Sequence, residues 1–241
     1  LYKHFLNPKH SRVIVENEDD INFFLSLGAV NKDHIFLIPG AGIDTKKFAP
    51  VVKQNSDGVC RVVMVARLIR EKGVYEFISV ANRIYREHLP ITCLLVGAPD
   101  FHNPSSMTDR EYRDLQDNPA LKCLGFTENV IPVLQQADIA CLPSYREGLP
   151  RSLIEACSCG LPIITTNTVG CREIVLNNNG LTVPVGDKQA LYEALVSMSR
   201  SPEMREEMGK NSRKLALDRF ETNKISEQTY KVVENLYGQC I

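Results

Sequence analysis

The chain has 241 residues, and its 44% hydrophobic content can fill the core of one large α/β domain or of two small ones. Its 28 basic residues are balanced by 29 acidic ones, which argues against a nucleic-acid-binding protein. The sequence contains no run of about 18 apolar residues, and residues 1–5 lack a secretory hydrophobic segment. We therefore expect a folded cytoplasmic protein, with at most peripheral association with the inner face of the cell membrane.

The cysteine and histidine patterns do not indicate a metal or disulfide site. Four of the eight cysteines fall in or beside apolar, strand-like segments: Cys60, Cys93, Cys123 and Cys141. Cys157 and Cys159 have C-x-C spacing rather than the C-x-x-C spacing of zinc ligands. The histidines are scattered among polar neighbours: His4, His10, His34, His88 and His102. The sequence predicts core thiols, solvent-facing histidines, no metal and no cofactor.

The first 50 residues do not form a complete domain by themselves. The predicted elements are one βαβ unit at most, with strands over residues 12–15 and 34–38 and a helix over 18–27. Gly40 and Gly42 then form a GxG pair without a third glycine or an ensuing helix, which indicates a tight turn rather than a dinucleotide fingerprint. The polar stretch over residues 53–58 predicts a domain boundary.

From residue 59 onward, short apolar runs alternate with helical patterns. The predicted strands are residues 61–66, 91–97, 121–124, 138–142, 162–166 and 181–183. The predicted helices are residues 72–87, 106–116, 128–136, 151–159, 170–176, 187–199, 202–217 and 220–237. This order predicts an α/β fold with a Rossmann-like, doubly wound parallel sheet, in which ligands bind at the carboxyl ends of the strands.

The strongest candidate for a functional site is the segment over residues 143–160, PSYREGLPRSLIEACSCG. It predicts a loop followed by a short helix, with Pro150 in the first helical turn and Gly160 as the C-terminal cap. The unpaired N–H groups at the start of this helix suit an anion such as phosphate. Glu147 in the loop and Glu155, about one and a half turns into the helix, bracket one ligand.

Glu147 and Glu155 form an E-x7-E motif in the setting SYREGLPRSLIEA, and several further segments match in the same order. The chain thereby resembles the retaining group 1 (GT4) glycosyltransferases of GT-B fold, and among them the members that build capsular and lipid-linked polysaccharides. The resemblance implies the C-terminal half of a GT-B fold. It also implies that the loop and helix bind a nucleotide-sugar donor, with the first glutamate near the sugar and the second on the ribose hydroxyls.

The resemblance further implies a domain organisation. Residues 1–50 are expected to be a remnant of the acceptor-side domain and hinge, residues 51–200 the donor-binding domain, and residues 201–241 helices that cross back to the N-terminal domain. A full GT-B enzyme carries the acceptor site largely on its first domain. We therefore expect this chain to need a missing N-terminal domain as its partner, and to bind the donor without transferring it at a useful rate.

Two cations, Arg67 and Lys72, lie five positions apart between a predicted strand and a predicted helix, where they suit a diphosphate. Taken alone, they are better explained by a solvated charged turn. They resemble the R-x4-K pair that binds the diphosphate in the family, and the E-x7-E motif favours that interpretation. Gly97, Phe126 and Thr127 lie in neighbouring loops, and the resemblance assigns the last two to the nucleotide base.

The resemblance implies front-face transfer with retention, in which the leaving diphosphate helps to take the acceptor proton. Arg67, Lys72 and Glu147 are the predicted catalytic residues. The predicted donor-binding residues are Arg67, Lys72, Gly97, Phe126, Thr127, Glu147, Gly148, Leu149, Pro150 and Glu155. The N–H groups of Gly148 and Leu149 are expected to stabilise the leaving diphosphate. No DxD motif is present, so no metal is expected.

The expected activity is transfer of a hexosyl or N-acetylhexosaminyl group from a UDP-sugar to a glycan or polyprenyl-diphosphate-linked acceptor in polysaccharide biosynthesis. Two alternatives stay open. A UDP-sugar epimerase of GT-B type needs no acceptor, and a non-catalytic nucleotide-sugar-binding module is disfavoured by the intact motif residues. A Rossmann dehydrogenase and a P-loop NTPase are disfavoured because their glycine-rich motifs are missing.

Overall fold

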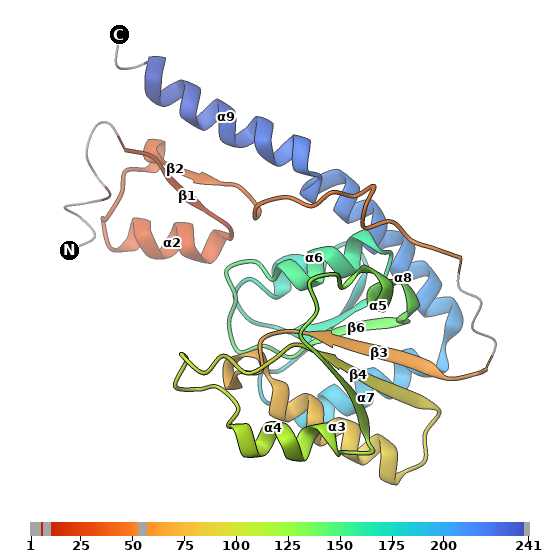
Figure 1. Cartoon of the computed structure of the whole chain (residues 1–241). Coiled ribbons are helices and arrows are strands. Elements are labelled where there is room, and N and C mark those ends of the chain that lie inside the picture. Colours follow the sequence, from red (N-terminus) through yellow and green to blue (C-terminus); the bar gives the residue numbers. More distant parts are fainter. Residues whose placement is uncertain (1–5, 7–10, 53–56, 239–241) are drawn as a thin grey trace.

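The computed structural model describes residue 6, residues 11–52 and residues 57–238 (Figure 1). Its centre is a six-stranded parallel sheet in the order β5-β4-β3-β6-β7-β8. The strands are β3 (Cys60–Val65), β4 (Ile91–Val96), β5 (Leu121–Gly125), β6 (Ile139–Leu142), β7 (Ile163–Thr166) and β8 (Gly180–Val183). Counted along the chain, this order is 3-2-1-4-5-6, the strand order of a Rossmann fold, so the predicted fold class is confirmed.

Helices cover both faces of the sheet, because each connection between parallel strands must cross one face. One face carries α3 (Val74–Arg86), α4 (Asp109–Gln116) and α7 (Lys188–Arg200) (Figure 1). The other carries α5 (Ile131–Gln136), α6 (Arg151–Ser158) and α8 (Pro202–Leu215). With both faces covered, every residue of β6 and β7 is buried, which explains their unbroken apolar runs.

The predicted helix over residues 170–176 is wrong. The structure has only a single 3-10 turn there (Arg172–Ile174). Gly170 has φ +77°, and a Cβ on it would lie 2.4 Å from the carbonyl oxygen of Glu147. Asn177 and Asn178 also have positive φ. The segment is therefore bent at both ends and cannot continue as a helix.

Three other helices begin later than predicted, because local caps determine where they start. α4 follows Thr108, which forms a capping box with Glu111. α5 begins where the side chain of Asn129 accepts a hydrogen bond from the N–H of Ile131, at 3.2 Å. α3 follows Gly73, whose left-handed φ of +73° ends a preceding 3-10 turn (Arg70–Lys72).

The N-terminal segment forms one βαβ unit beside the large domain, as predicted (Figure 1). Its elements are β1 (Val13–Val15), α2 (Glu18–Ser26), a 3-10 turn (Lys32–His34) and β2 (Ile35–Leu37). β1 and β2 pair in parallel. The unit has a small apolar cluster of its own around Val15, Val30 and Ile35, separate from the large core.

A tight turn leads out of this unit, and the C-terminal part of the chain returns to the same place. Gly40 and Gly42 have φ of +77° and +78°, so the predicted turn is confirmed. Ile43 forms a bridge with Glu221, which follows a π-turn (Ala216–Phe220). Arg213 of α8 donates to the carbonyl oxygens of Thr45 and Phe48, at 2.9 and 3.0 Å, and so binds the linker to the large domain.

The last helix, α9 (Thr222–Gly238), extends past the N-terminal unit (Figure 1). Ile225 and Val232 are buried in a cluster with Ile38. Tyr230 and Val233, on the same helix, are exposed. Within the part of the chain that the structure describes, no helix combines the length and apolar character needed to cross a membrane.

The described cysteines are thiols in or near the core, as predicted. Cys123 is half-buried. The other six are buried: Cys60, Cys93, Cys141, Cys157, Cys159 and Cys171. Burial raises the pKa of Cys93 and of Cys157 to about 12, so both stay protonated at neutral pH. No group of three or more His, Cys, Asp or Glu among the described residues is arranged to hold a metal ion.

The histidines follow the prediction only in part. His88 and His102 are exposed. His34 is half-buried, and its Nδ1 is buried without a hydrogen-bond partner among the described residues, so the solvent-facing prediction is wrong for it. His34 is the last residue of the 3-10 turn that precedes β2. His4, His10, Cys240 and the linker residues 53–56 lie outside the described residues.

Candidate functional site

A cavity of about 520 Å³ opens at the carboxyl ends of the central strands, where the strand order reverses between β3 and β6. Open parallel sheets bind ligands at such a point, because the loops leave the two neighbouring strands toward opposite sides. The residues that line the cavity include Arg67, Lys72, Gly97, Asp100, Phe126, Thr127, Glu147, Pro150, Arg151, Ser152 and Glu155. Its volume lies in the range of small-molecule sites.

Two glycines let backbone segments approach closely beside the cavity. A Cβ on Gly97 would lie 1.8 Å from the carbonyl oxygen of Ala66, and one on Gly73 would lie 2.0 Å from that of Pro143. Because no side chain intervenes, the end of β4 packs closely against the end of β3, and the start of α3 packs closely against the segment after β6. A larger residue at either position would push apart the segments that carry the cationic side chains.

Lys72 and Glu147 form an ion pair across the cavity wall. Lys72 Nζ donates to both carboxylate oxygens of Glu147, at 2.6 Å each. The two side chains are only 20% and 10% exposed. Ser144, two residues after the end of β6, donates a further hydrogen bond to Glu147 Oε1 at 2.8 Å. The loop over residues 144–149 therefore presents Glu147 with its charge already balanced.

Arg67 follows β3 and pairs with Asp100, which follows β4. Its Nη1 donates to Asp100 Oδ2 at 2.6 Å. The Arg67 side chain is 59% exposed, so this pair contributes little to stability. An exposed guanidinium can exchange its carboxylate partner for a phosphate, which offers the same bidentate geometry. Both predicted cations of the site thus carry a carboxylate partner.

The start of α6 faces the cavity, with Pro150 as the N-cap residue. No side chain among the described residues caps its first turn, so the first N–H groups are open to an acceptor from a ligand. Further along, Glu155 accepts a hydrogen bond from Arg151 Nε at 3.1 Å. Burial raises the pKa of Glu155, and Arg151 lowers it by a smaller amount. Glu155 is therefore a carboxylate held in a partly desolvated wall.

Phe126 and Thr127 follow β5 at the rim of the cavity. Phe126 is 73% exposed, which is unusual for a ring of this size. Gly125 turns the chain there with φ +69°. The Thr127 hydroxyl accepts a hydrogen bond from the N–H of Asn129 at 3.2 Å and so braces the turn. An exposed aromatic face beside a cavity provides a stacking surface for a planar group.

Most of the predicted site residues line this cavity, but Gly148 and Leu149 do not. The carbonyl oxygen of Gly148 accepts a hydrogen bond from Asn17, and the N–H of Leu149 donates to the carboxylate of Glu16. These backbone groups are thus engaged by the N-terminal unit. In this structure the open N–H groups near the cavity are those of α6.

Two polar residues of the site had no role in the sequence prediction. Asp100 lies three residues after the predicted strand over 91–97, and Ser144 lies two residues after the one over 138–142. A polar side chain within a few residues of the end of an apolar strand is the signal that could have identified both. Their partners, Arg67 and Glu147, come from other strands, and local sequence does not reveal such pairs.

The sequence pattern of the family described as "Glycosyl transferases group 1" matches residues 46–215, which is more than half of the chain. The chain belongs to the group 1 glycosyltransferase family. The matched region contains all the strands of the large sheet and every residue named around the cavity. The resemblance inferred from the E-x7-E motif is thereby confirmed.

Two relatives within this family are similar over much of the chain. The N,N'-diacetylbacillosaminyl-diphospho-undecaprenol alpha-1,3-N-acetylgalactosaminyltransferase of Campylobacter jejuni is 29% identical over 248 residues, which cover 98% of this chain. The capsular polysaccharide biosynthesis glycosyltransferase CapM of Staphylococcus aureus is 28% identical over 175 residues, which cover 72%. The chain spans 63% and 44% of the lengths of these two relatives.

Among solved structures, that of Anabaena HepE in complex with UDP superposes on this chain with a TM-score of 0.79. The two chains are 20% identical, and the match covers 93% of this chain and 64% of HepE. At this identity the similarity concerns the fold. It confirms an α/β fold that matches about half of a GT-B glycosyltransferase structure.

We expect Lys72→Met and Glu147→Gln each to lower the free energy of unfolding by about 1–3 kcal/mol, because each change leaves the remaining charge largely shielded from water and without its partner. The double variant should recover part of this loss, since neither charge then remains. Urea denaturation of the four proteins gives the coupling free energy. Simple additivity of the two losses would contradict a coupled pair.

A second expectation concerns the pH dependence of stability. Burial raises the pKa of Glu155 above its ordinary value of 4.5, so the folded protein favours the protonated form of this side chain. Protonated Glu155 therefore contributes to stability below about pH 4.5, and this contribution is lost as the pH rises through the raised pKa. Glu155→Gln should therefore raise the Tm of the ligand-free protein at about pH 7.5 but not at about pH 4. Loss of the exposed Arg151 pair opposes this gain by only about 0.3–0.5 kcal/mol. Scanning calorimetry at both pH values checks it, and a lower Tm at pH 7.5 would contradict it.

Proposed function

We propose that this chain is the donor-binding half of a retaining glycosyltransferase. The reaction transfers a hexosyl or N-acetylhexosaminyl group from a UDP-sugar to a glycan or polyprenyl-diphosphate-linked acceptor in polysaccharide biosynthesis. The observation that carries the proposal is a single cavity that combines Arg67, Lys72 and the uncapped start of α6 with Glu147 and Glu155. Such a set provides for a diphosphate, a sugar and a ribose at neighbouring points.

The names of the relatives support these substrate classes. The Campylobacter jejuni protein is named for a sugar linked to diphospho-undecaprenol, and the Staphylococcus aureus protein for capsular polysaccharide. The HepE structure contains UDP. By analogy, we propose that the acceptor of this chain is a lipid-linked or polymeric saccharide. The proposed leaving group is uridine diphosphate.

The diphosphate of the donor binds between Arg67, Lys72 and the start of α6. It carries more negative charge than one carboxylate and accepts several hydrogen bonds, so it competes with Asp100 for Arg67 and with Glu147 for Lys72. The helix start adds open N–H groups and the positive end of its dipole. Donor binding therefore exchanges existing ion pairs for new ones.

The two ends of the donor meet different walls of the cavity. Glu155, on α6, accepts hydrogen bonds from the ribose hydroxyls, and Phe126 offers its exposed ring to the uracil. Gly97 and Thr127 lie in the adjoining loops, where the base approaches the backbone. At the other end, Glu147 faces the sugar once Lys72 turns to the diphosphate.

In the transfer step, the bond between the anomeric carbon and the oxygen of the β-phosphate breaks, and the acceptor oxygen bonds to the same face of that carbon. The acceptor proton passes to the leaving diphosphate. Arg67 and Lys72 stabilise the negative charge that develops on this diphosphate. Glu147 orients the sugar, so it affects the transition state through the position of the anomeric carbon.

Thermal-shift and calorimetric titration with UDP, ADP, GDP and a panel of UDP-sugars tests the proposal. UDP at a hundred times its dissociation constant should stabilise the chain by about 2.7 kcal/mol. Product analysis with and without acceptor then separates the reaction classes, because transfer releases UDP only with acceptor and epimerisation changes the sugar without one. Absence of stabilisation by every nucleotide would contradict the proposal.

We expect Arg67→Ala to weaken UDP binding by about tenfold to a hundredfold and to leave uridine binding almost unchanged, since hydrogen bonds between charged groups contribute about 1.5–3 kcal/mol. Asp100→Asn should strengthen UDP binding, because it removes the carboxylate that competes for Arg67. Isothermal titration calorimetry measures both. Arg110→Ala, an exposed arginine on α4, is the matched control. Equal losses for uridine and UDP would contradict the diphosphate assignment.

Substitutions of the two glutamates should weaken the binding of different ligands. Glu155→Gln should weaken uridine, UDP and UDP-sugar alike, because all three contain the ribose. Glu147→Gln should act mainly on UDP-sugar, and its effect on UDP should be small because Lys72 is then released for the diphosphate. The ratio of the UDP-sugar and UDP dissociation constants reports the difference. A Glu147→Gln protein with an unchanged ratio would show that the two roles are wrongly assigned.

A further inference from the structure

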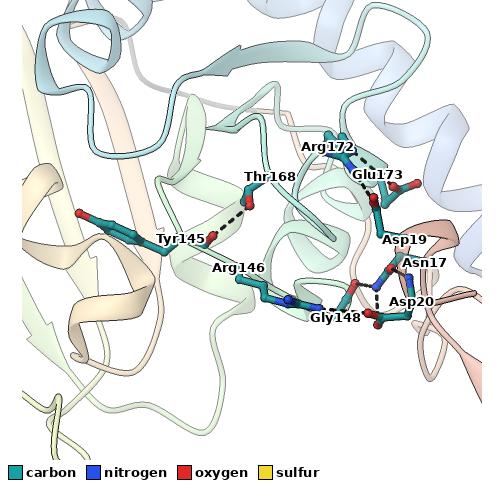
Figure 2. A network of polar contacts seen from close by, with 9 residues as sticks. All are labelled: Asn17, Asp19, Asp20, Tyr145, Arg146, Gly148, Thr168, Arg172 and Glu173. Atoms are coloured by element: carbon teal, nitrogen blue, oxygen red, sulfur yellow. Dashed lines mark hydrogen bonds and ion pairs between the residues drawn. The ribbon is translucent and has the colours of Figure 1, made fainter. Parts of the chain in front are cut away.

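The N-terminal unit makes a concentrated set of polar contacts with the large domain at the start of α2 (Figure 2). Arg146 Nη2 pairs with Asp20 Oδ1 at 3.2 Å, and Arg172 pairs with Asp19. Arg146 belongs to the 144–149 loop, which carries Glu147, and Arg172 lies in the turn after β7. The two arginine side chains are 69% and 40% exposed, so each pair contributes little to stability. Neither pair holds the backbone of the loop.

Asn17 reaches the loop backbone directly. It is the N-cap residue of α2 and is only 1% exposed. Its Oδ1 accepts from the N–H of Asp20 at 2.8 Å, and its Nδ2 donates to Asp20 Oδ2 at 2.9 Å and to the carbonyl oxygen of Gly148 at 3.0 Å. A buried amide with both of its polar atoms bonded has one well-defined orientation. One of these bonds crosses to the residue that follows Glu147.

Glu16 holds the other side of the same peptide group. Its carboxylate accepts a hydrogen bond from the N–H of Leu149. Desolvation raises the pKa of Glu16 and the charge of Asp20 raises it further, whereas the bond from Leu149 lowers it. A Cβ on Gly148 would lie 2.6 Å from Glu16 Oε2, so a side chain at this position would displace the carboxylate. The glycine is needed here for close approach.

The opposite side of the loop packs against backbone. The N–H of Glu147 donates to the carbonyl oxygen of Val169 at 3.1 Å. A Cβ on Gly170 would lie 2.4 Å from the carbonyl oxygen of Glu147 and 2.5 Å from that of Gly148. The loop is therefore enclosed between the turn after β7 and the N-terminal unit, with no room to move toward either.

We propose that Glu16 and Asn17 are positioning residues of the donor site, which fix the peptide group between Gly148 and Leu149 and thereby set Glu147 against the donor sugar. The C=O and N–H of a trans peptide point in opposite directions, so a donor on one and an acceptor on the other fix its rotation. This inference rests on the proposed function. It makes sugar recognition depend on a segment outside the donor domain.

The clasp formed by Glu16 and Asn17 should affect the sugar end of the donor more than the nucleotide end. Glu147 is adjacent to the clasped peptide, whereas Arg67 follows β3 and Glu155 lies on α6. Loosening the peptide therefore displaces the Glu147 carboxylate and leaves the contacts of Arg67 with the diphosphate and of Glu155 with the ribose in place. A general loss of folding would instead weaken all ligands together.

Asn17→Ser tests the inference directly. Serine keeps the N-cap acceptor of α2 but lacks the donor to Gly148. We expect it to weaken UDP-sugar binding about three- to tenfold, the effect of one lost hydrogen bond, with UDP binding unchanged. Glu16→Ala should do the same, and Glu16→Gln, which keeps an acceptor for Leu149, should restore near-normal binding. Asp19→Asn breaks the neighbouring pair without touching the peptide and is the matched control.

Calorimetric titration of the chain with UDP and UDP-sugar measures the ratio of the two dissociation constants. Amide hydrogen exchange at Leu149, without ligand, measures how well the hydrogen bond to Glu16 protects this N–H. Faster exchange in Glu16→Ala together with a changed ratio supports the inference. An unchanged ratio, or equal losses for UDP and UDP-sugar, would overturn it while the proposed function stands. Failure of the wild-type chain to bind UDP would overturn the proposed function, and the positioning role with it.

Discussion

Strand order reverses between β3 and β6, and this reversal brings loops from distant parts of the chain to one cavity. The segment after β3 carries Lys72, and the loop after β6 carries Glu147, so their ion pair spans the switch point. The close approach of Gly73 to Pro143 makes this distance possible, because a side chain there would hold the segments apart. The cavity, its charges and the start of α6 all depend on this one crossing.

The electrostatics of the site follow from the same geometry. Arg67 and Lys72 each have a carboxylate within 2.6 Å, so the ligand-free cavity carries no uncompensated cation from this pair. A ligand with one negative charge gains little by displacing a carboxylate, whereas a diphosphate offers two charged groups to the two cations at once. Internal pairing of this kind favours a diphosphate over singly charged anions and keeps the site stable when it is empty.

The 144–149 loop belongs structurally to two bodies. β6 and the turn after β7 support it from the large domain, and Glu16 and Asn17 hold it from the N-terminal unit. Figure 2 shows Asn17 beside Gly148. The N-terminal unit has its own small cluster and reaches the large core through a linker bound by Arg213. A loop shared in this way couples the donor cavity to the N-terminal unit.

Local sequence determined the alternation of strands and helices and the fold class, because apolar periodicity and turn residues act over a few positions. It also pointed to Arg67, Lys72 and Glu147, since each lies between a predicted strand and the helix that follows it. It failed over residues 170–176, where distant carbonyl groups impose the bend at the glycine. Only the tertiary structure decided the pairings, between Lys72 and Glu147 at a separation of 75 residues and between Asn17 and the loop at 131. Such contacts depend on the order of strands in the sheet and on how the N-terminal unit docks, which no local pattern encodes.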